Sequence, residues 1–232
     1  MSRAIERMLD EAWAAIGAGN FIKARSFARR ASRGAPPELK AEALHALGRV
    51  ELDSDRPKDA LRLLTEAKRL GGSSPDLVYD LGLAHEALGD DAAMRRAFLE
   101  VLERDPEYDA DLPIRIDEDR LVEIAETLLE ELPEQMRRLL ADVPIIVEDR
   151  PTRDLVEEGF DPRALGLFDG PPWSEQGLTG PQLNRIVLYR TNIAAACSST
   201  AEAEEQIRIT LLHETAHFFG SDEDGVAGLG FA

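Results

Sequence analysis

The run Leu211–Gly220 reads LLHETAHFFG and sets two histidines four residues apart. Residues at that spacing share one face of an α-helix, so the imidazoles of His213 and His217 can reach a single ion. Glu214 falls on a neighbouring face, where its carboxylate can accept a proton from water on a metal. The stretch therefore predicts a helix that carries a metal site.

A long helix is expected around this motif, over residues 200–219. Ser199 and Glu202 have the spacing of a capping box at its start. Gly220 comes three residues after His217, where a helix can end in the left-handed conformation. An apolar stripe follows helical periodicity through Ala203, Ile207, Leu211 and Phe218.

Three carboxylates follow the expected helix, and each is a hard oxygen ligand close to the two imidazoles: Asp222, Glu223 and Asp224. The spacing of His213 and His217 is the HExxH pattern of zinc hydrolases. Imidazole and carboxylate ligands with an open position suit catalytic zinc, whereas closed structural sites favour thiolates. We therefore expect Zn²⁺ bound by His213, His217 and one of these acids.

The composition is that of a globular protein, with 232 residues, 44% hydrophobic residues and a formal net charge of -18. Nucleic acid and anionic membranes would repel so acidic a chain, so neither is an expected partner. No apolar run approaches the roughly 18 residues of a spanning helix, and the N-terminus lacks a signal-peptide core. Cys197 is alone and follows three alanines, which indicates a buried small residue in a reducing compartment. A cytoplasmic location is expected.

Residues 5–106 contain a repeat with a step of 34 residues. Leu47-Gly48 recurs as Leu81-Gly82, and the trio Ala60, Leu64 and Ala67 recurs as Met94, Phe98 and Val101. Each unit is expected to form two amphipathic helices, for example over residues 38–53 and 58–70. The period and the small residues at helix crossings resemble the tetratricopeptide repeat, whose stacked helices often bind peptides or partner helices.

The second half predicts a mixture of helices and short strands. Helices are expected over residues 117–132, 133–141, 152–158 and 192–197, and strands over 144–148, 164–168 and 185–190. The long HExxH helix would pack on this short mixed sheet, which makes the fold class α+β. The expected domains are residues 1–110, an all-α repeat domain, and residues 111–232, the metal-bearing domain.

Five ordered stretches between residues 118 and 224 resemble the minimal zincins, small bacterial domains regarded as possible zinc metallopeptidases. They read LPEQMRRLL, VPIIVEDRP, LGLFDG, RIVLYR and LLHETAHFFG. The family pattern continues with a Gly three residues after the motif and an acid three residues later. The resemblance thus favours Glu223 as the third ligand. Asp222 and Asp224 stay alternatives, because the family more often has Asp at the position of Glu223 and an apolar residue at the position of Ser221.

The resemblance implies a zinc-dependent metallopeptidase in which Glu214 is the catalytic residue. Glu214 would take a proton from the attacking water and pass it to the leaving amine. In zincins an edge strand above the metal helix aligns the substrate backbone. Residues 185–189 are a candidate for that strand, although a central position is equally compatible with their sequence. Tyr189 and Arg190 are candidates for stabilising the oxyanion.

Three functional hypotheses follow from these features. The first is a zinc peptidase whose helical repeats bind the peptide or protein substrate. The second is a protein-interaction module with a vestigial or structural metal site. The third is a metal-dependent hydrolase that cleaves a non-peptide amide.

Overall fold

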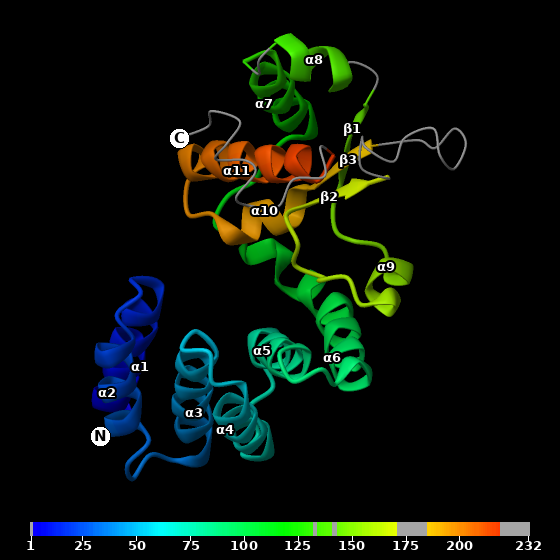
Figure 1. The fold of residues 1–232 in the computed structure, drawn as a ribbon. Helices are drawn as coiled ribbons and strands as arrows, with labels where there is room; N and C mark the ends of the chain where they lie inside the picture. The colour runs from blue at the N-terminus through cyan, green and yellow to red at the C-terminus, as the bar shows by residue number, and fades with distance from the viewer. Residues whose placement is uncertain (1, 132–133, 141–142, 171–184, 219–232) are drawn as a thin grey trace. The chain divides into compact units, whose positions relative to one another are not determined.

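The structure is a computed structural model that describes residues 2–131, 134–140, 143–170 and 185–218. The chain forms two compact units (Figure 1). One comprises Met1–Pro106 with Arg153–Gly159, and the other comprises Glu107–Thr152 with Phe160–Ala232. The fold combines many helices with one small mixed sheet among the described residues, as expected for the α+β class.

The first unit is helical, and its consecutive helices pack in pairs. The helices are α1 (Ser2–Gly17), α2 (Phe21–Ala31), α3 (Pro37–Leu52), α4 (Pro57–Arg69), α5 (Pro75–Glu86) and α6 (Asp91–Arg104). Side-chain caps fix several of the starts, because Asn20, Ser74 and Asp90 each accept a hydrogen bond from a backbone N–H of the first turn. Proline opens α3, α4 and α5, where its missing N–H leaves no bond unmade.

Two glycines set the close approach of helices within the pairs α3–α4 and α5–α6. A Cβ atom on Gly48 would lie 2.5 Å from Leu64 Cδ2, and one on Gly82 would lie 2.5 Å from Phe98 Cε1. Gly82 follows Gly48 by 34 residues, and Phe98 follows Leu64 by the same step. The sequence repeat is therefore also a repeat of contacts. Glycine is required because any side chain at these crossings would separate the helices.

A short helix from the second half of the sequence, α9 (Arg153–Glu158), packs on α6 in this same unit. Val156 is fully buried and joins Met94 and Phe98 in one apolar cluster. Arg153 donates a hydrogen bond to Glu103 of α6 at 2.7 Å. The last helix pair of the unit is thus covered by a segment that follows it by about fifty residues in the chain.

The second unit contains a three-stranded sheet of order β1-β3-β2. The strands are β1 (Ile145–Glu148), β2 (Gly166–Asp169) and β3 (Arg185–Tyr189). β1 runs parallel to β3, and β2 runs antiparallel to it. The helices are α7 (Glu118–Glu130), α8 (Glu134–Leu140), α10 (Arg190–Ala196) and α11 (Thr200–Phe218), and a 3-10 helix, Asp105–Asp111, begins in the first unit and ends in this one.

The core of this unit lies between the sheet and the helices α7 and α11 (Figure 1). Ile186 and Leu188 of β3 pack against Leu121 of α7 and against Ile207 and Leu211 of α11. Cys197 is buried in the same cluster, which confirms it as a packing residue. Burial and nearby Glu202 raise the pKa of its thiol.

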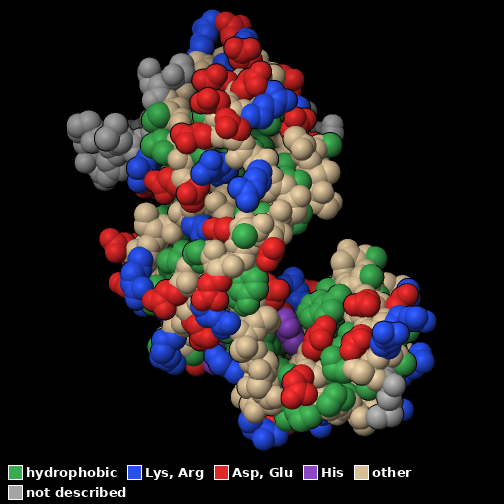
Figure 2. Space-filling model, turned by 180° about the vertical axis from the view of Figure 1, so that it is seen from behind, with side chains coloured by type: hydrophobic (Ala, Val, Ile, Leu, Met, Phe, Trp, Pro, Cys, Tyr) green, Lys and Arg blue, Asp and Glu red, His purple; other side chains and the backbone are tan. Residues whose placement is uncertain are grey.

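The helices and strands predicted for the second half are confirmed within a few residues at each end. Acidic side chains are spread over the face seen in Figure 2, with Lys and Arg among them. Among the described residues, no helix combines the length and the apolar character needed to cross a membrane.

Candidate metal and peptidase site

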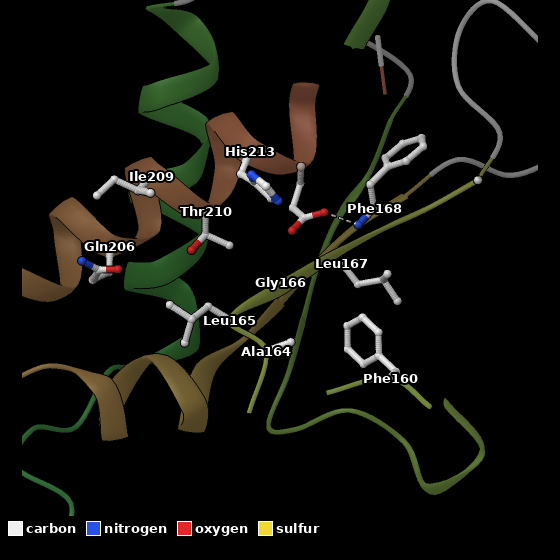
Figure 3. Close-up of a pocket in the computed structure, with 12 residues that line it drawn as sticks. Phe160, Ala164, Leu165, Gly166, Leu167, Phe168, Gln206, Ile209, Thr210 and His213 are labelled. Atoms are coloured by element: carbon white, nitrogen blue, oxygen red, sulfur yellow. Dashed lines mark hydrogen bonds between the residues drawn. The ribbon is translucent and has the colours of Figure 1, made fainter. Parts of the chain in front are cut away.

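A cleft of about 660 Å³ lies between α11 and β2 (Figure 3). The helix contributes a row of side chains one turn apart, and the strand segment contributes mainly apolar residues. The lining includes Gln206, Ile209, Thr210, His213 and Glu214 from the helix, and Leu165, Gly166, Leu167 and Phe168 from the strand and the residue before it. The cleft thus combines two groups of the HExxH motif with an apolar wall.

Glu214 is buried against β2 and is only 8% exposed. Its Oε2 accepts a hydrogen bond of 2.6 Å from the backbone N–H of Phe168, drawn as the dashed line in Figure 3. A buried carboxylate needs such a donor, because an unsolvated charge without hydrogen bonds is costly. The bond fixes the Glu214 carboxylate at the edge of the strand.

Gly166 allows the helix to lie this close to the strand. A Cβ atom on Gly166 would stand 2.6 Å from Thr210 Cγ2, 3.1 Å from the Val187 carbonyl oxygen and 3.3 Å from Glu214 Cγ. A glycine inside a strand often marks a close backbone approach, so LGLFDG contained a signal of this contact. The role of Gly166 is apparent only from the structure.

The strand beside the helix is β2, whereas β3, the sequence candidate for a substrate-aligning edge strand, is central. The backbone N–H of Tyr189 donates to the carbonyl of Leu165, so Leu165 faces β3. Backbone groups alternate direction along a strand, so those of Gly166 and Phe168 face the outer edge. The outward N–H of Phe168 is the group that binds Glu214.

Asn192 of α10 holds the segment that leads into β2. This buried side chain donates hydrogen bonds from Nδ2 to the carbonyl oxygens of Pro162 at 2.9 Å and Ala164 at 2.8 Å. This anchor cannot be predicted from the sequence, because the partners of Asn192 are backbone groups about thirty residues away. Asn192 thereby positions the start of the strand that binds Glu214.

The expected metal ligands are described only in part. His213 is exposed and its side chain lines the cleft. The backbone of His217 lies one turn later in α11, which continues to Phe218, but its side chain lies outside the described residues. Asp222, Glu223 and Asp224 also lie outside them. Within the described part of the chain, no group of three His, Cys, Asp or Glu side chains is placed to hold a metal ion.

The two residues considered for oxyanion stabilisation are held elsewhere. Tyr189 is fully buried, and burial together with nearby Glu148 raises the pKa of its phenol to about 12. Its hydroxyl has no hydrogen-bond partner among the described residues. The Arg190 guanidinium donates to Asp149 through Nε at 3.1 Å, and hydrogen bonding by Arg190 lowers the pKa of that carboxyl. Neither residue lines the cleft.

Comparison with known proteins agrees with the motif. No curated protein matches the chain. Residues 140–230, less than half of the chain, match the model of the zincin-like metallopeptidase family, so the cleft and its helix lie in a segment similar to those metallopeptidases.

Proposed function

We propose that the protein is a zinc-dependent metallopeptidase-like hydrolase that cleaves a peptide or protein in the cleft between α11 and β2. The observation that carries the proposal is the pairing of Glu214 with the backbone of Phe168 inside that cleft, with His213 beside it. The family match over residues 140–230 supports metallopeptidase-like chemistry. Together they favour a catalytic role for this helix over an incidental motif.

The residues available in this segment fit a zinc ion by the chemistry of their donors. His213 and His217 stand four residues apart in a continuous helix, and Glu223 would supply a carboxylate, with Asp222 and Asp224 as alternatives. Zinc bound by such a set supplies a Lewis acid and lowers the pKa of a coordinated water. His213 already borders the cleft, which is the requirement for a ligand of a catalytic site.

The outer edge of β2 suits a substrate in extended conformation. Gly166 presents backbone groups there, whereas the N–H of Phe168 already binds Glu214, and a peptide lying alongside Gly166 would extend the sheet by one strand. Such pairing would hold the scissile carbonyl at a fixed distance from α11. Glu214 would accept a proton from the attacking water and deliver it to the leaving nitrogen.

A Glu214→Gln substitution tests the catalytic role. The amide keeps the shape of the carboxylate but cannot accept the proton, so kcat/KM on a cleaved peptide should fall by about 10²- to 10⁴-fold. Cleavage of a peptide library by the purified protein, followed by mass spectrometry, measures the effect. Glu205→Gln, an exposed change on the same helix, should leave cleavage unaltered. Equal turnover by Glu214→Gln and the unsubstituted protein would exclude Glu214 as the base.

A His213→Ala substitution tests the metal site independently of turnover. We expect about one zinc per chain in the unsubstituted protein and a large loss of zinc in the variant, because one of three ligands is gone. Elemental analysis of the purified proteins gives the ratio. His85→Ala, which removes a histidine of the helical unit, is the control and should retain zinc. Retention of zinc by His213→Ala would rule out His213 as a ligand.

A second function, protein binding by the tetratricopeptide-like helices, is favoured by a groove in the helical unit. Trp13, His45, Glu38 and Glu42 line this groove, whose volume is about 370 Å³. Glu38 and Glu42 have no basic partner among the described residues, so an arginine side chain of a partner could pair with them beside Trp13.

Fluorescence anisotropy with a labelled arginine-containing peptide tests this. The double variant Glu38→Gln/Glu42→Gln should bind the peptide more weakly, and the control Glu126→Gln should not. Equal binding by the unsubstituted protein and both variants would exclude the groove as the binding site.

A further inference from the structure

A second pocket of the helical unit, of about 550 Å³, is lined by arginines in a strongly acidic chain. Four guanidinium groups surround it, from Arg25, Arg29, Arg56 and Arg62. The lining contains two carboxylates, Glu51 and Asp59, so its formal charge is positive. The whole chain, by contrast, has a formal net charge of -18. Leu47 and Leu63 complete the wall.

Buried Glu51 organises two of the arginines. It is 7% exposed, and its two oxygens bind different partners. Oε1 accepts from Arg25 Nε at 3.0 Å, and Oε2 lies 2.6 Å from an Nη of Arg56. One guanidinium comes from α2 and the other from the residue that caps α4, so Glu51 of α3 fixes both ahead of any ligand. Each guanidinium keeps further N–H donors, since Arg has five.

The other two arginines carry charge that the described residues leave largely uncompensated. Arg29 has no ion-pair partner among them, and Arg62 forms an ion pair with Asp59 at an N–O distance of 3.7 Å, which is long. Arg25 and Arg29 are four residues apart on α2, so their side chains share one face of that helix. The pocket therefore presents four guanidinium groups to one common space, and Glu51 holds two of them in place.

We propose that this pocket binds a phosphate monoester through its phosphoryl oxygens. Guanidinium groups match the geometry of such oxyanions and bind them in bidentate fashion, which ammonium groups do not. A dianion neutralises the surplus positive charge left after Glu51 and Asp59 are counted. The volume lies within the range of small-molecule sites, roughly 300–1,000 Å³, and leaves room for the group that carries the phosphate.

Titration of the full chain with inorganic phosphate and with O-phosphoserine, at constant ionic strength, tests the proposal. Isothermal calorimetry should show saturable binding at one site per chain. Arg29→Gln/Arg62→Gln should weaken it by about tenfold or more, because two charged donors are lost. Both side chains are exposed, so the fold should tolerate the change. The control is Arg96→Gln, an exposed change on α6 outside the pocket that should leave affinity within about twofold.

The two probes distinguish the source of the phosphate. Tighter binding of O-phosphoserine supports an ester whose organic part fills the pocket, whereas equal affinity supports recognition of the phosphoryl group alone. Three results would overturn the proposal: absence of saturable binding, equal weakening by Arg96→Gln, or acetate binding as tightly as phosphate. Circular dichroism of each variant separates loss of binding from loss of fold.

Discussion

At the scale of single residues, Gly166 connects the packing of the second unit to its proposed chemistry. Its missing side chain lets α11 approach β2 closely enough for the Glu214 carboxylate to meet the N–H of Phe168. The obstacles to a Cβ at this position differ in kind. Thr210 is a side chain, whereas the carbonyl of Val187 is backbone of the central strand and cannot turn aside.

Gly166→Ala should therefore destabilise the protein by about 1–3 kcal/mol and reduce any peptidase activity that depends on Glu214. Urea unfolding and peptide cleavage measure the two effects. Thr210→Ser removes the methyl group that the new Cβ would meet at 2.6 Å, so the double variant should recover part of the stability lost. Strictly additive losses in the double variant would show that Thr210 is not the obstacle.

Tyr189 gives a prediction about pH. Its phenol has a pKa raised from 10.0 to about 12, mainly by burial. The unfolded chain ionises this group first, so stability is unaffected below pH 10 and falls as the pH rises from 10 to about 12, by on the order of 2 kcal/mol. Tyr189→Phe should lose less stability over that interval, as measured by urea unfolding at the two ends. Identical losses would show that other groups govern the alkaline limb.

At the scale of elements, the sequence predicted the presence of helices and strands far better than their neighbours in space. Residues 186–189 are an apolar run that begins with two β-branched side chains, and residues 185–189 do form a strand. Whether that strand is central depends on which segments pair with it, and β2 pairs through backbone groups that every residue possesses. The HExxH helix was likewise predicted from local spacing, whereas the anchor of Asn192 on Pro162 and Ala164 is entirely non-local.

The helix pairs of the first unit offer an element-scale test. Gly48→Ala and Gly82→Ala should each lower the free energy of unfolding by about 1–3 kcal/mol, because the added Cβ meets Leu64 or Phe98 at 2.5 Å. The two losses should be similar if the crossings are equivalent. Gly17→Ala is the control, since nothing lies within 4 Å of its Cβ position and alanine favours helix. Thermal unfolding measures the three losses. A loss of stability in Gly17→Ala as large as in the other two variants would contradict steric packing as the reason for glycine at positions 48 and 82.

At the scale of the whole molecule, the chain order and the compact units do not coincide. The sequence predicts domains that divide at residue 110; the first compact unit ends its long segment at Pro106 and also includes α9, which lies between β1 and β2 in the chain. The sequence could not reveal this, because Val156 follows Phe98 by more than fifty residues and nothing local couples them. The chain therefore passes between the units more than once, and a fragment ending at residue 110 lacks a segment of the helical core.

Val156→Ala tests whether α9 belongs to the stability of the helical unit. The buried side chain packs on Met94 and Phe98, so its truncation should cost on the order of 1–3 kcal/mol. Hydrogen exchange followed by mass spectrometry should show faster exchange in α6, because that helix loses the packing over its apolar face. Leu121→Ala, a truncation in the core of the second unit, should instead speed exchange in α7 and α11. If Val156→Ala leaves hydrogen exchange in α6 unchanged and speeds it only in β1 and β2, then α9 does not stabilise the helical unit. In that case a fragment ending at residue 110 should be as stable as the helical unit that includes α9.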